Sequence, residues 1–205
     1  MIFIPGSNQE IELPQGLVKN RLKFYAIDNS FSINFRADRI DIECINVLGK
    51  PVMSCEDFCE KAKSIVAAIE QTHVRKANRL AFVTTYRNFQ LSEPEKDQVY
   101  SKIFSKLTEI SEVPPIEWNH RTCRRYSRTF NSKTEIFNNV YNLGRVFGVN
   151  TKNRQAHNFF ELGLDINTNP ENIGVRFSTP DFNGFLSEVS AWNQELLNNV
   201  NGILK

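Results

Sequence analysis

Alternating apolar and polar residues predict the first unmistakable element as a β-hairpin. The alternation runs over residues 31–35 and again over 40–44, on either side of Arg36-Ala37-Asp38, where the chain must turn. A period of two places the apolar side chains of a strand on one face and the polar ones on the other. The sequence therefore predicts an antiparallel pair with one buried face, next to a further strand at 22–27.

Two segments with helical spacing follow, and each begins with a capping signal. Ser54 precedes Asp57 by three residues, and Ser92 precedes Glu95 by three. A hydroxyl followed three residues later by an acid is typical of the first turn of a helix. We expect helices from these two serines, the second of which Pro114-Pro115 ends.

Residues rich in β-branched and aromatic side chains predict strands at 79–89, 116–130, 160–166 and 175–177. The segment 133–149 fits both a helical and an extended period, and its composition favours a strand. A last, long amphipathic helix is expected over 179–203.

This order of elements indicates an α+β fold. We expect a curved, mostly antiparallel sheet packed by two central helices and a long C-terminal helix, in a helix-grip-like or duplicated sheet-and-helix layout. With 205 residues, one hydrophobic core is sufficient, so the expectation is a single domain over 1–205.

Charge is distributed unevenly along the chain. The whole protein is only +2, but residues 118–134 carry five cations and no acid, which leaves the remainder at −3. Arginines interleaved with aromatic side chains suit an anionic, stackable partner such as nucleic acid. The competing interpretation is a solvated strand face.

Strand parity divides this basic stretch between two faces. Even-numbered positions share one side and odd-numbered positions the other. We expect one site from the even face and a second contact, or only solvent, at the odd face. Replacement of the even pair of arginines should therefore weaken binding more than replacement of the odd pair. The candidate binding residues are Trp118, His120, Arg124, Tyr126 and Arg128 on the even face, and Arg121 and Arg125 on the odd face.

No catalytic or metal signature accompanies the basic stretch. The three histidines stand in no metal-binding spacing, and Cys55 and Cys59 lack further ligands nearby. Cys123 lies among cations that favour a thiolate, but the sequence locates no base for it. We expect no catalytic residues, no metal and no cofactor. The sequence favours a binding protein over an enzyme.

The N-terminal residues show no signal-peptide pattern, and no window approaches the apolar length needed to span a bilayer. The four cysteines are therefore expected to stay reduced in a cytoplasmic protein.

Three features resemble a sporadically distributed family of uncharacterised bacterial proteins: the strand at 79–89 with Tyr86-Arg87-Asn88, the strand around Leu164-Asp165-Ile166, and a closing helix with Asn193. The resemblance covers about two-thirds of the chain and leaves the basic stretch largely outside. It implies an α+β fold and a bacterial setting, and it implies no activity.

Three functions remain open from the sequence. The first is a binding module that recognises nucleic acid or an acidic protein through the basic strand. The second is a pocket protein in which the C-terminal helix closes over the sheet and some of the 16 Phe line a cavity for a small apolar ligand. The third is a protein-interaction or homodimerising module that uses an exposed strand edge.

Overall fold

The computed structural model describes residues 2–12, 16–46, 53–72, 76–88, 90–104, 115–149 and 156–204. Its elements confirm an α+β fold, with two four-stranded antiparallel sheets and, in the described ranges, three helices. The chain divides into two compact units, Met1–Ala68 and Ile69–Lys205. The single domain expected over 1–205 stays a prediction.

The first unit holds the sheet β1-β2-β3-β4 and most of helix α1. The hairpin expected at 31–44 is confirmed, and the strand expected at 22–27 is longer and is preceded by another strand. Phe31 and Ile33 form its core with Ala26, and Phe58 and Ile65 of α1 pack against them. The elements are β1 (Phe3–Glu12), β2 (Leu17–Ala26), β3 (Phe31–Phe35), β4 (Ile40–Cys44) and α1 (Cys55–Glu70).

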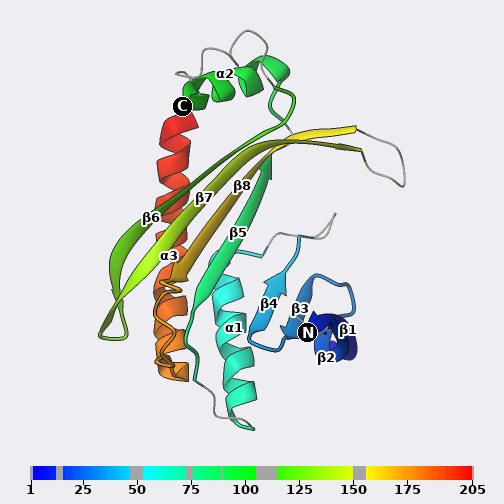
Figure 1. Ribbon diagram of the computed structural model, residues 1–205, viewed down its shortest axis with the longest axis vertical. Coiled ribbons are helices and arrows are strands. Elements are labelled where there is room, and N and C mark those ends of the chain that lie inside the picture. Colours follow the sequence, from blue (N-terminus) through cyan, green and yellow to red (C-terminus); the bar gives the residue numbers. More distant parts are fainter. Residues whose placement is uncertain are drawn as a thin grey trace. The chain divides into compact units, whose positions relative to one another are not determined.

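A second sheet, with the order β5-β8-β7-β6, and two helices form the other unit (Figure 1). Every neighbouring pair is antiparallel, and β6 lies at one edge. The ambiguous segment 133–149 is a strand, as its composition favoured. The elements are β5 (Ala81–Asn88), α2 (Glu93–Phe104), β6 (Trp118–Phe130), β7 (Lys133–Val149), β8 (Ala156–Thr168) and α3 (Thr179–Leu204).

The strand expected at 175–177 is wrong, because only a single bridge forms there, between Ala77 and Phe177. Ser178 follows at once and accepts the first backbone hydrogen bond of α3, from the amide of Phe182 at 3.0 Å. The helix begins too soon after the bridge for a ladder to extend.

Helix α3 packs along one face of the second sheet through aromatic rings. Phe137 of β7 and Phe185 of α3 are both fully buried, and their rings are stacked with centroids 5.8 Å apart. Phe130 and Trp192 pack edge-on against this pair. Such ring packing adds to the free energy gained by burying the rings. The core of this unit therefore fixes α3 beneath β6 and β7.

Both capping signals are confirmed. The Ser54 hydroxyl accepts a hydrogen bond from the amide of Asp57 at 3.0 Å. At the start of α2, the amide and hydroxyl of Ser92 donate to the Glu95 carboxylate at 2.8 and 2.7 Å. These contacts satisfy polar groups that the first turn of a helix otherwise leaves unpaired.

Candidate functional site

Strand β6 carries the basic stretch along the edge of the second sheet. It pairs with β7 over its whole length, from Trp118 opposite Arg145 to Phe130 opposite Lys133. This unbroken register confirms the two faces expected from parity, because it contains no bulge that would bring all four arginines to one side. The even face is the one against which α2 and α3 pack.

The structure buries both ends of the even face. Trp118 is only 9% exposed, and its ring packs against Tyr100 and Phe104 of α2 and Phe160 of β8. Phe130 lies in the aromatic core beneath α3. Trp118 therefore belongs to the core and is not available to stack on a ligand, contrary to its expected place in the site.

Arg128 is held by α3 and lies near the ring of Tyr126. The Arg128 guanidinium lies 4.9 Å from the ring centre of Trp192 and 5.8 Å from that of Tyr126. It also donates to the Glu195 carboxylate at 3.1 Å. Cation–π contact and an ion pair hold Arg128 in place and neutralise its charge, so it contributes less to an anion site than the sequence indicated.

Besides Tyr126, the exposed even positions are Arg124 and His120. The His120 ring contacts Phe104 edge-on, with centroids 5.7 Å apart, and remains exposed. Arg124 is exposed and, among the described residues, makes no ion pair. Directly across from it in β7 lies Asn139, which is fully buried and whose side-chain amide finds no hydrogen-bond partner in the described part of the chain. The residue next to Arg124 in the ladder is therefore a buried polar one, Asn139.

Arg121, Cys123 and Arg125 lie on the odd, open face. Arg125 donates to Glu171 at 2.5 Å and to the side chain of Asn138 at 3.3 Å, and the bond to Glu171 raises the pKa of the guanidinium. Arg121 is exposed and has no ion pair to any residue that the structure describes. Cys123 is an exposed free thiol. Each face therefore offers one unpaired arginine, Arg124 or Arg121, and one that an acid neutralises.

Gly144 allows β6 to pair closely with β7 at its first residues. A Cβ atom at Gly144 would lie 2.8 Å from the backbone oxygen of Trp118, closer than such atoms approach. Alanine there forces the backbones apart near Trp118. Around this glycine lies a hollow of about 170 Å³ with a mixed polar and apolar lining, which includes Asn119, Val146 and Glu161.

We expect Gly144→Ala to lower the free energy of unfolding by about 1–2 kcal/mol, since overpacking displaces backbone that side-chain rotation cannot relieve. Gly148→Ala in the same strand is the control, because a Cβ there meets nothing within 4 Å. Urea denaturation of both variants measures the difference. Equal stability of the two would contradict the close contact at Trp118.

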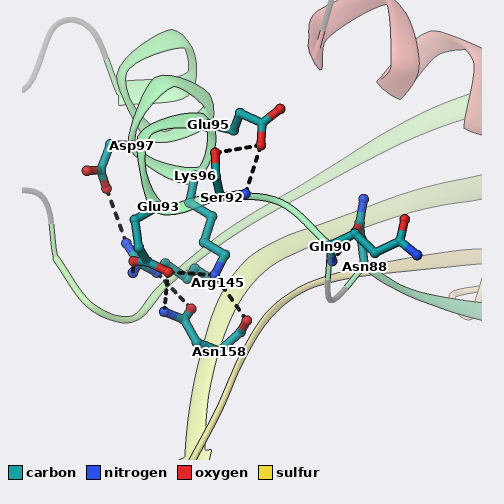
Figure 2. Close-up of polar contacts among 9 residues, drawn as sticks. All are labelled: Asn88, Gln90, Ser92, Glu93, Glu95, Lys96, Asp97, Arg145 and Asn158. Carbon is teal, nitrogen blue, oxygen red and sulfur yellow. Dashed lines mark hydrogen bonds and ion pairs between the residues drawn. The ribbon is translucent and has the colours of Figure 1, made fainter.

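A charge cluster of two buried cations and two exposed acids joins α2 to β7 and β8, and no pattern in the sequence predicts it (Figure 2). The Arg145 side chain is 6% exposed and donates to Asn158 at 3.1 Å, to Asp97 at 3.3 Å and to Glu93 at 2.5 Å. The Lys96 ammonium, similarly buried, donates to Glu93 at 2.7 Å and to the backbone oxygen of Asn158. Hydrogen bonds from Lys96 and attraction to both cations lower the pKa of Glu93.

The donors of this cluster are engaged by side chains and backbone of the protein itself. An anion entering the cluster would have to displace Glu93 or Asp97. Buried cations that bond to several elements at once are typical of structural contacts between those elements. We therefore assign the cluster to the attachment of α2, which in turn covers Trp118.

No three His, Cys, Asp or Glu side chains of the described residues gather closely enough to hold a metal ion. Burial raises the pKa of Cys59 to about 12, so this thiol is protonated at neutral pH. No helix in the described ranges is long and apolar enough to cross a membrane.

Two of the residues that carried the family resemblance, Tyr86 and Asn193, are in contact in the second unit. The Asn193 amide of α3 donates to the Tyr86 hydroxyl at 2.8 Å and accepts from the Thr84 hydroxyl at 2.7 Å. Asn193 is 2% exposed, so the contact ties the helix to β5 from within. No protein-family model matches the chain, and neither a curated protein nor a solved structure is significantly similar to it.

Proposed function

We propose that the protein is a non-enzymatic binding module that recognises an anionic partner, nucleic acid or acidic protein, through β6. The observation that carries this proposal is the exposure of Arg121 and Arg124 on opposite faces of an edge strand, neither in an ion pair with a described residue. Surface arginines without a neighbouring acid are the groups with which an incoming carboxylate or phosphate forms short, charge-assisted hydrogen bonds.

Charge reversal at these two positions tests the proposal. We expect Arg121→Glu combined with Arg124→Glu to weaken binding of a polyanion by about tenfold or more, because attraction becomes repulsion. Fluorescence anisotropy with labelled oligothymidylate and with labelled polyglutamate, over a salt series, measures it. Affinity should fall as salt rises, since binding releases counterions from the polyanion.

The matched control reverses two arginines away from β6. Arg79→Glu combined with Arg87→Glu changes the net charge by the same amount, at exposed positions at and before β5. Binding by this control within about twofold of the unaltered protein supports a local site. Equal losses in both double variants, or affinity that is indifferent to salt, would refute recognition through β6.

Reversal of the arginines by face separates the two sides of the strand. The even pair, Arg124 and Arg128, and the odd pair, Arg121 and Arg125, each contain one arginine that an acid already neutralises. That the even pair matters more stays a prediction. The same titration shows which of the two double variants loses more affinity for the polyanion.

The pocket alternative finds less support. Its phenylalanines would surround a cavity between α3 and the sheet, but Phe130, Phe137, Phe177 and Phe185 are almost fully buried and pack ring against ring. Side chains that pack in this way occupy the space that a ligand would need. A hollow of about 400 Å³ lies instead in the first unit, to which α3 does not belong, and its mainly apolar lining is formed by Phe3, Phe31, Glu60, Lys61, Ser64 and Ile65.

A further inference from the structure

The outer edge of β6 is a long stretch of unpaired backbone. The strand has 13 residues and pairs on one side only, with β7, and no residue that the structure describes pairs with its other side. Nearly all side chains from Asn119 to Ser127 are exposed. An open edge of this length presents a row of hydrogen-bonding groups that a further strand can use.

The turn between β6 and β7 determines which backbone groups point outward. Asn131 and Ser132, with φ angles of 46° and 59°, form a two-residue turn of the kind favoured in hairpins. The flanking residues Phe130 and Lys133 are then hydrogen-bonded to each other. Because such pairs alternate along an antiparallel ladder, even-numbered residues of β6 bond to β7. The outward amides and carbonyls belong to Asn119, Arg121, Cys123, Arg125, Ser127 and Thr129.

Charge restricts what can pair with this edge. Cations stand on both faces, with Arg124 on one and Arg121 and Arg125 on the other. In a two-fold pairing of two copies centred on Cys123, each Arg121 would face an Arg125, and like charges directly opposite destabilise a pair of strands. The edge therefore disfavours a second copy in this arrangement and favours an acidic strand.

Strand β6 offers few free aromatic rings on which nucleic-acid bases could stack. Trp118 is buried under α2, and the Tyr126 ring already has the Arg128 guanidinium near its face. Base stacking on aromatic rings supplies much of the affinity for single strands. The aromatic groups that would make β6 a stacking surface are thus largely occupied, whereas its backbone edge is open.

We propose that an extended acidic segment of another protein adds to β6 as a fifth strand of the second sheet. Outward backbone groups of β6 bind the main chain of the segment, and its carboxylates pair with Arg121 on one face and Arg124 on the other. This inference rests on the proposed recognition of an anion and specifies the partner as a polypeptide bound through its backbone.

A labelled peptide in which pairs of glutamates alternate with pairs of threonines serves as the probe, because neighbouring residues of a strand point to opposite faces and this order places carboxylates on both. Its control is the same peptide with alternate backbone amides N-methylated, which removes hydrogen-bond donors along one edge and keeps every charge. Two such control peptides are used, and each is N-methylated along a different one of the two edges. We expect methylation of one edge, and not of the other, to weaken binding by about tenfold or more, since several hydrogen bonds of this kind are lost together.

Cys123→Pro provides the complementary variant. Proline removes an outward amide from the middle of the edge without taking a bond from the β7 ladder, a position where strands tolerate it. Loss of peptide binding by about tenfold, in a variant whose melting transition is retained, supports strand addition. Isotope-edited infrared or amide-exchange measurements should show protection of the outward amides of β6 when the peptide is bound.

The two proposals fail in different ways. Salt-dependent binding of the peptide that neither methylated form weakens refutes strand addition and leaves recognition of an anion standing. Oligothymidylate that binds more tightly than the peptide, at equal charge, also overturns strand addition and makes nucleic acid the partner. Absence of binding by every polyanion refutes both.

Discussion

Replacing Arg145 with alanine is expected to lower the free energy of unfolding by about 2–3 kcal/mol, because the packing and the charge-assisted hydrogen bonds of a buried guanidinium are lost together. Its acids, Glu93 and Asp97, are 59% and 44% exposed and are solvated once it is gone. The Arg145 side chain is 6% exposed and joins β7 to Asn158 of β8 and to Glu93 and Asp97 of α2. Its removal leaves an unfilled volume beside Lys96 and separates α2 from the sheet. Chemical denaturation measures the loss, and amide exchange locates it in α2.

Arg87→Ala is the matched control, since Arg87 also pairs with a glutamate, Glu161, but is 56% exposed. Exposed pairs of this kind contribute about 0–1 kcal/mol. Arg145→Met, which retains most of the volume and none of the charge, should lie between the two variants. A loss at Arg145 no greater than that at Arg87 would show that the cluster does not hold α2.

Binding of the peptide can also be measured with the Arg145 variant. If α2 loosens, Trp118 loses its cover and the first residues of β6 become more mobile. The centre of β6, around Cys123, pairs with β7 independently of α2. Binding should therefore weaken less than in the double charge reversal at Arg121 and Arg124, which act on the partner directly.

Local patterns in the sequence predicted the elements that local physics determines. The alternation at 31–44 gave the β3–β4 hairpin, and the serines at 54 and 92 gave two helix starts, because each signal lies within a few residues of the structure that it causes. Parity likewise assigned the faces of β6 correctly. Strand β1 was missed because Pro5 and Gly6 disfavour a strand, although an edge strand tolerates both.

The candidate site needed information that is not local. Parity placed Trp118 and Arg124 on one face, but which part of that face is covered depends on α2. The rings of α2 that cover Trp118 belong to Tyr100 and Phe104, 18 and 14 positions earlier in the sequence. The partners of Arg125 and Arg128 are Glu171 and Glu195, 46 and 67 residues further along. Two arginines of a segment that has no acid in its sequence therefore pair with acids from other elements in the folded protein.

Asp181→Asn is expected to lower the free energy of unfolding by about 3 kcal/mol at neutral pH, because hydrogen bonds to a charged group are among the strongest in a folded protein. The side chain is 2% exposed at the start of α3. It accepts from Lys133 at 2.7 Å, from Asn131 at 2.9 Å and from the amide and hydroxyl of Ser178 at 2.9 and 2.8 Å. The asparagine cannot accept all of these hydrogen bonds.

The pH dependence of this loss identifies the carboxylate as its cause. Burial alone would raise the pKa of Asp181, but the hydrogen bonds from Lys133, Ser178 and Asn131 outweigh it and hold the pKa well below its usual range. The stabilisation is therefore fully present above the pKa of the unfolded chain, about 3.9, and is lost as the pH falls toward the folded-state value. Urea denaturation from pH 7 down to about pH 3 should show the two proteins converging below about pH 4. A difference in stability that stays constant over this range would mean that asparagine disturbs packing at the start of α3 rather than removing a bound charge.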